Sequence, residues 1–215
     1  MCARYTLTLE QAKLVIAGLV NIFAFAPRYN IGPAQRVPVV LSDAKGARQV
    51  EMRWGFKSQW SSTLHINAQA ERVRQTATFK ALLHQRCLVP MDGFYEWKPD
   101  KSPVRFVRRR RDVFCVAGLW KAEEKPGLDL PVTEQSFVLL TTAASPSVAT
   151  IHSRMPFIVQ PQHYDWWLAG DLADTVLNCP DDTPLEWYPV SREVNNVRNE
   201  HPSLVRPVPV EKELF

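Results

Sequence analysis

Short apolar segments, some of them alternating with polar residues, recur along the chain and predict many short β-strands. A hairpin turn is expected at Asp43 to Gly46, between the first two of these strands. The expected strands are Val37 to Leu41, Gln49 to Trp54, Leu64 to Ala68, Val104 to Val107, Val113 to Trp120, Ser136 to Thr142, Phe157 to Gln160 and Leu185 to Val190.

Helical spacing occurs in only three places. Thr8 and Gln11 form a capping box that would begin the first helix. The apolar positions of that helix would share one face: Leu9, Ala12, Ile16 and Leu19. Thr78 to His84 and Pro161 to Leu168 predict two more helices, the second with proline in its first turn.

This mixture predicts an α+β fold, because strands and helices do not alternate strictly along the chain. We expect mainly antiparallel β-sheets that form a barrel-like core with a few flanking helices. Residues 1 to 215 are predicted to form a single domain. Its proline-rich C-terminal tail, about 202 to 215, is expected to lie extended on the body.

Composition agrees with a globular protein of 215 residues, since 46% of them are hydrophobic and 22% are charged. The net charge of +4 is too small to require a nucleic-acid partner. The densest charge cluster, Arg108 to Arg111, is interpreted as a solvated strand end or loop rather than a phosphate clamp.

The four cysteines, Cys2, Cys87, Cys115 and Cys179, lie far apart without a C-x-x-C pair. This spacing indicates neither a disulfide framework nor a zinc site, and no cofactor or metal is expected. We find no signal-type segment and no apolar stretch of membrane-spanning length. A reducing cytoplasm is therefore the expected location.

Cys2 directly follows the initiator methionine. Removal of Met1 would leave an α-amine and a thiol on adjacent carbons, and these titrate near ~8 and ~8.5. The amine can condense with an aldehyde to an imine, and the thiol can then close a five-membered thiazolidine ring. An N-terminal nucleophile of this kind is an established form of covalent catalysis. The alternative is an incidental residue on a frayed terminus.

Three further polar residues stand in unusual surroundings. Glu96 is flanked by aromatic residues, which would desolvate its carboxylate and raise its pKa, unless it is exposed on an edge strand. His152 follows an apolar strand and is the best acid-base candidate among five histidines, unless it is a surface residue. Asn67 is either a turn residue or a hydrogen-bonding group in a pocket.

Taken together, nine blocks of sequence resemble one family, the SOS response-associated peptidase (SRAP) family. They keep the family's order over nearly the whole chain. The blocks are Met1 to Tyr5, Arg28 to Pro33, Met52 to Phe56, Ile66 to Ala68, Arg86 to Trp97, Ala117 to Trp120, Leu140 to Ala143, Ile151 to Pro156, and Pro189 to Ser191 with Asn195 to Asn199.

The resemblance implies a sensor of abasic sites in single-stranded DNA that acts in the DNA damage response. The processed Cys2 would attack the open-chain aldehyde of the abasic sugar and form a stable thiazolidine crosslink, which shields the lesion. Asn67 would orient the sugar or its phosphate. Glu96 would shuttle protons, and His152 would assist ring opening and imine formation. The protein would be a monomer, cytoplasmic and nucleoid-associated when bound to DNA.

The resemblance also implies a set of DNA contacts. Arg4 and Arg154 would bind phosphates, and Trp54, Trp60 and Pro33 would offer stacking or wedge surfaces to flanking bases. The full set is Arg4, Pro33, Trp54, Trp60, Thr142 and Arg154.

The chain departs from the family's pattern at two positions. Ala3 replaces a common glycine beside the nucleophile. Gln69 replaces the usual arginine after Asn67 and Ala68, which implies weaker binding of DNA.

Two other functions remain open from the sequence. Cys2, His152 and Glu96 could form a thiol peptidase, as the family's name suggests, and its action could be limited to the Met1–Cys2 bond. Alternatively, the protein could bind single-stranded DNA non-covalently with a passive Cys2. The modest net charge suits a protein whose affinity is completed by a covalent bond.

Overall fold

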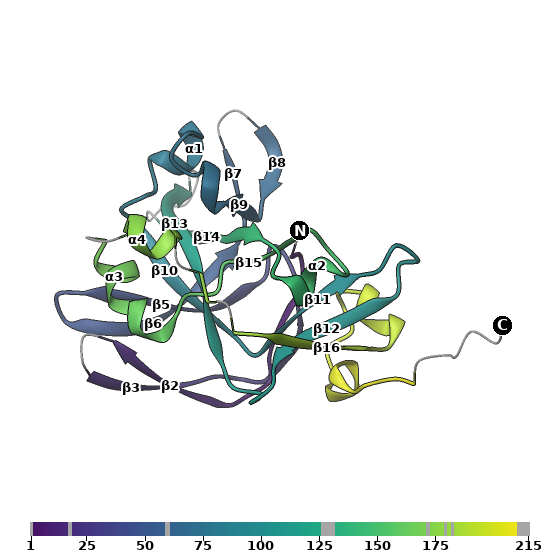
Figure 1. Cartoon of the computed structure of the whole chain (residues 1–215). Coiled ribbons are helices and arrows are strands. Elements are labelled where there is room, and N and C mark those ends of the chain that lie inside the picture. The colour runs from purple at the N-terminus through teal and green to yellow at the C-terminus, as the bar shows by residue number, and fades with distance from the viewer. Residues whose placement is uncertain are drawn as a thin grey trace.

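A closed ring of five strands forms the core of the computed structural model (Figure 1), which describes residues 2–16, 19–58, 61–125, 132–170, 173–178, 180–181 and 183–209. The ring runs in the order β13 (Phe114–Lys125), β10 (Arg86–Met91), β5 (Arg36–Asp43), β6 (Gly46–Trp54) and β14 (Val132–Ala143). The pairing of β13 with β14 closes it. Only the β6–β14 contact in the ring is parallel. The predicted barrel-like α+β fold is thereby confirmed.

A second, antiparallel sheet has the order β16 (Leu185–Pro189), β12 (Pro103–Arg108), β11 (Gly93–Trp97), β1 (Tyr5–Leu7) and β4 (Arg28–Ile31). Only Asp92 separates β10 of the barrel from β11 of this sheet. The buried Asp92 carboxylate accepts from Arg105 at 2.9 Å and from the Thr6 hydroxyl at 2.6 Å, so an ion pair and a hydrogen bond hold the junction.

Strand β14 carries two short strands beside its barrel neighbours. β9 (Asn67–Gln69) continues the line of β6 along one edge of β14, in parallel. β15 (Arg154–Pro156) continues the line of β13 along the other edge. Cys2, the first described residue, lies beside β9, because the Asn67 side chain donates to its carbonyl.

The helical elements are short and peripheral. They are η1 (Ala70–Arg72), α1 (Ala77–Lys80), α2 (Pro146–Ala149), η2 (Pro161–His163), α3 (Tyr164–Ala169), α4 (Ala173–Asn178), η3 (Arg192–Asn195) and η4 (Pro202–Val205). The helix predicted from Pro161 is confirmed as η2 and α3, whereas the one from Thr78 is reduced to α1 and turns. A hairpin of β7 (Phe56–Ser58) and β8 (Ser61–His65) flanks α1 (Figure 1). No helix in the described ranges is both long and apolar enough to cross a membrane.

The helix predicted after Thr8 is wrong. The segment is instead a hairpin of β2 (Gln11–Ile16) and β3 (Leu19–Ala24). Ala12 and Leu14 are buried two residues apart, whereas Leu9 is 38% exposed, so the strand period decides the structure. Thr8 forms no capping box with Gln11, because its hydroxyl and its backbone N–H both donate to the Asp92 carboxylate, the N–H at 2.8 Å.

Two smaller predictions also need correction. Phe157 to Gln160 forms only isolated bridges, Ile158 with Val116 and Val159 with Pro180, rather than a strand. The tail is not extended from its start, because Pro202–Val205 forms η4, with Leu204 fully buried. It lies on the body beyond that point, where the Val208 N–H donates to the Pro189 carbonyl at 3.0 Å.

Candidate functional site: a buried thiol between Asn67 and Glu96

Cys2 lies in the core and not on a frayed terminus. The side chain has no exposed surface, and its Sγ donates a long hydrogen bond of 3.6 Å to the Arg4 carbonyl. Tyr5 pairs with Phe94, and the Tyr95 N–H donates to the Arg4 carbonyl at 3.0 Å. The residues before β1 therefore run alongside β11, which brings Cys2 towards Glu96.

Asn67 binds Cys2 directly. Strand β9 sets Asn67 opposite Leu139, and its Nδ2 donates to the Cys2 carbonyl at 2.7 Å. Its Oδ1 is buried and has no hydrogen-bond partner among the described residues. A buried acceptor without a partner is uncommon in folded proteins. Asn67 is therefore a hydrogen-bonding residue on strand β9, and the alternative of a turn residue is wrong.

Glu96 is buried on an interior strand, since β11 lies between β1 and β12 and the residue is 3% exposed. The alternative of an exposed edge glutamate is therefore wrong. Burial raises the pKa of its carboxyl group to about 7. Within the described chain its Oε1 has no hydrogen-bond partner. At neutral pH the group can both give and accept a proton. The raised pKa agrees with the prediction from its aromatic neighbours in the sequence.

The Cys2 thiol is electrostatically linked to this carboxyl group. Burial raises the pKa of the thiol well above its ordinary value, and the negative charge of Glu96 raises it further. The thiol is therefore protonated at neutral pH, and it can act as a nucleophile only if its proton is removed during the reaction.

His152 is half-buried in the loop between α2 and β15. Its Nδ1 lies 3.0 Å from the backbone nitrogen of Arg154 and 3.1 Å from the carbonyl oxygen of that residue. The neutral ring can accept from the N–H, and the protonated ring can donate to the carbonyl, so either form keeps a partner. Burial lowers the pKa of His152, which favours the neutral ring at pH 7.

The two arginines expected at the DNA are both engaged in hydrogen bonds. Arg4 Nη1 donates to Asn30 Oδ1 at 2.8 Å and to the Val194 carbonyl at 2.9 Å. Arg154 makes a two-pronged ion pair with Glu71, with both N–O distances 2.9 Å. The Thr142 hydroxyl also contacts the Glu71 carboxylate, at 3.4 Å.

The three residues expected to stack on DNA bases differ in their exposure to solvent. Trp54 is fully buried, packs edge-on against Tyr5 at 5.3 Å and donates to the Ile66 carbonyl at 2.8 Å. It cannot stack on a base, so that prediction is wrong. Pro33 is partly exposed in the turn after β4, where it remains a candidate. Trp60 lies outside the described residues.

Sequence reasoning missed two residues that organise the site. The buried Asn30 holds Arg4, and its Nδ2 donates to three carbonyls, those of Val194, Asn196 and Asn199. Glu71 holds Arg154 across 83 positions of sequence. Neither residue carried a local signal, because each partner comes from a distant element.

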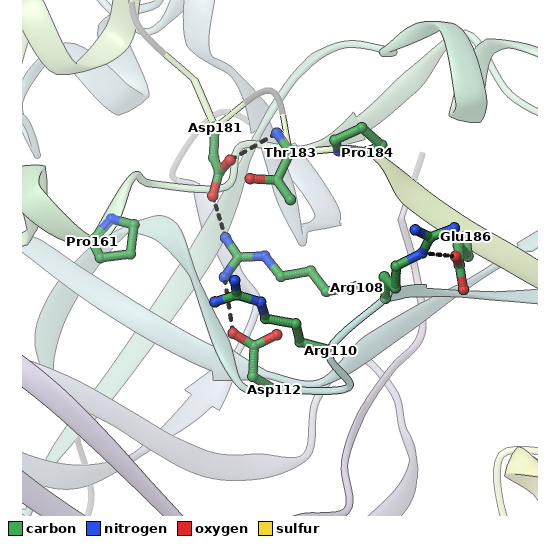
Figure 2. Close-up of a pocket in the computed structure, with 9 residues that line it drawn as sticks. Arg108, Arg110, Asp112, Pro161, Asp181, Thr183, Pro184 and Glu186 are labelled. Carbon is green, nitrogen blue, oxygen red and sulfur yellow. Dashed lines mark hydrogen bonds and ion pairs between the residues drawn. The ribbon is translucent and has the colours of Figure 1, made fainter.

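A separate cavity of about 720 Å³ lies at the end of β12 (Figure 2). Arg108 lies between Asp181 and Asp112 there, and Arg109 pairs with Glu186 at 2.9 Å. With Arg110, three arginines face three carboxylates in this lining, and none of the residues around Cys2 lines the cavity. Arg108 is buried, so only the remainder of the basic run is the solvated segment that was expected.

The model of the SOS response associated peptidase (SRAP) family matches residues 1–197. The chain belongs to the SRAP family. It is 30% identical over 224 residues to the abasic site processing protein YoqW of Bacillus subtilis, covering 95% of this chain and 99% of the relative.

Two other proteins are similar to this chain over most of its length. The abasic site processing protein YedK of Escherichia coli is 26% identical, covering 84% of this chain and 85% of the relative. The crystal structure of a phage-related protein of Bordetella bronchiseptica superimposes with a TM-score of 0.71 at 26% identity, covering 89% of this chain and 95% of that one. Within the described ranges, the SRAP chain has no cluster of His, Cys, Asp or Glu that could hold a metal ion.

Proposed function

We propose that this SRAP protein detects abasic sites in single-stranded DNA and captures them covalently through Cys2 after removal of Met1. The observation that carries the proposal is the placement of Cys2. Asn67 fixes its carbonyl at 2.7 Å, and an ionisable, buried Glu96 interacts with its thiol. The names of the relatives, abasic site processing proteins, support the class of substrate.

The reaction balances as a condensation. The α-amine adds to the sugar aldehyde, and loss of one water gives the imine. The sulfur then bonds to the imine carbon while the thiol proton leaves and the nitrogen gains a proton. The carboxyl group of Glu96, with a pKa of about 7, suits this proton relay at neutral pH. The unpaired oxygens of Asn67 and Glu96 offer acceptors to the sugar hydroxyls.

The same electrostatics favour capture of an aldehyde over peptide hydrolysis. Cysteine peptidases rely on a neighbouring positive charge that lowers the pKa of the thiol. Here both burial and Glu96 raise the pKa of Cys2. A protonated thiol can still add to an imine, because the imine carbon is strongly electrophilic and the carboxylate can receive the proton.

Single-stranded DNA is the proposed partner because the aldehyde must leave the base stack to reach the amine, and an unpaired strand spares that cost. The test is to compare the processed protein with the same protein acetylated at its α-amine. We expect an abasic oligonucleotide to form a denaturation-resistant complex only with the free amine. Equal crosslinking by the acetylated protein would refute imine formation.

A further inference from the structure

The guanidinium group of Arg154 already has an anionic partner. Nη1 donates to Glu71 Oε1 and Nη2 donates to Glu71 Oε2, each at 2.9 Å. Nη2 also donates to the Thr141 carbonyl at 2.7 Å. This two-pronged geometry is the one that a phosphate would take on an arginine.

The same carboxylate reaches the neighbouring candidate for DNA contact. The Thr142 hydroxyl lies 3.4 Å from Glu71 Oε1. Glu71 belongs to η1, directly after β9 with Asn67, and Arg154 belongs to β15 on the other edge of β14. Glu71 therefore bridges the two edges of β14, four residues after Asn67, which itself binds the Cys2 carbonyl.

We propose that Glu71 is a built-in competitor for the DNA backbone, which occupies Arg154 and Thr142 until a phosphate displaces it. This inference rests on the proposed function, because it needs a DNA phosphate to approach Arg154. The exposure of the pair makes the exchange feasible. The Glu71 side chain is 49% exposed, so water can hydrate its carboxylate once it is released, and the Arg154 side chain keeps 18% of its surface open to an incoming phosphate.

Such competition would lower affinity for intact DNA. Before binding, Glu71 neutralises Arg154, and the hydrogen bond from Arg154 keeps the pKa of Glu71 below its ordinary value, so the Glu71 carboxylate is ionised at neutral pH. When a phosphate takes Arg154, Glu71 is released as a negative charge beside the DNA. Binding therefore adds no net positive charge around the phosphate, because the freed Glu71 carboxylate offsets the charge of Arg154. The protein would then bind undamaged DNA weakly, and only the covalent bond formed by Cys2 would attach it to DNA for long.

The test measures non-covalent binding of the full chain to an undamaged single-stranded oligonucleotide by fluorescence anisotropy over a range of salt concentrations. We expect Glu71→Gln, which keeps the shape and removes the charge, to bind about two- to fivefold more tightly. Its plot of log K against log salt should steepen by about 0.7, the value for one additional phosphate neutralised on a single strand.

Glu186→Gln is the matched control, because it also removes one carboxylate from an arginine pair, in this case with Arg109 at the distant cavity. Its affinity and salt slope should equal those of the unaltered protein. In an Arg154→Gln background, Glu71→Gln should lose its effect, which separates competition for Arg154 from general repulsion of DNA.

Weaker binding by Glu71→Gln would overturn the inference, because Glu71 would then position Arg154 for DNA. Unchanged binding, or equal gains with Glu186→Gln, would also overturn it. The proposed function is judged separately, by whether the unaltered protein crosslinks an abasic oligonucleotide. A crosslinking protein with an inert Glu71 would refute only the competition.

Discussion

Replacement of Glu96 by Gln should stabilise the protein, and more so at high pH. The folded state raises the pKa of this carboxyl group from 4.5 to about 7, a difference of about 3 kcal/mol between its protonated and ionised forms. Between these two values the folded protein binds more protons at Glu96 than the unfolded chain does. Stability therefore falls as pH rises through this window, and the loss is complete above the folded pKa.

Glutamine has nearly the same shape and cannot ionise, so Glu96→Gln removes this loss. We expect its gain in the free energy of unfolding to be about 2.5 kcal/mol larger at pH 8 than at pH 5, measured by urea denaturation at both values. Glu186→Gln, on the exposed Arg109 pair, is the control and should show no such trend. A gain that does not depend on pH would refute the claim that buried Glu96 is ionised at a cost.

Three kinetic predictions concern the same site. We compare the crosslinking rate of the unaltered protein with that of Glu96→Gln. The ratio of the two rates should rise about fivefold from pH 6 to 7 and about twofold from pH 7 to 8, because it follows the ionised fraction of Glu96. A ratio that does not change with pH would exclude Glu96 as the proton acceptor. Asn67→Ala, which releases the Cys2 carbonyl, should slow single-turnover crosslinking about tenfold, and a normal rate would show that this hydrogen bond does not position the nucleophile. His152→Ala should slow crosslinking at pH 7, and an unchanged rate would remove His152 from the mechanism.

The sequence predicts those elements whose local period is unambiguous. Gln49 to Trp54 alternates polar and apolar residues and lies in β6, and the short apolar run from Val113 to Trp120 coincides with the start of β13 from Phe114 on. The hairpin after Thr8 was misread because its apolar residues fit a period of 3.6 as well as one of 2. Only the burial of one face against the core chooses between these periods, and no local sequence shows that.

The reactive residues of the site could be predicted from the sequence, whereas most of their hydrogen-bond and ion-pair partners could not. Cys2 and Glu96 are chemically unusual where they stand, and the structure buries both of them. Trp54 was misassigned because an aromatic residue on a strand does not reveal which face is exposed. Asn30 and Glu71 bind partners from distant elements, and such pairs exist only once the sheets are assembled.

The central claim is covalent capture of an aldehyde by the α-amine and thiol of Cys2. The most direct test is the intact mass of the purified protein before and after incubation with an abasic single-stranded oligonucleotide. We predict a protein that lacks Met1, and then an adduct equal to protein plus oligonucleotide minus one water. Cys2→Ala should give no such stable adduct. A processed protein that forms no adduct, or full crosslinking by Cys2→Ala, would contradict the account.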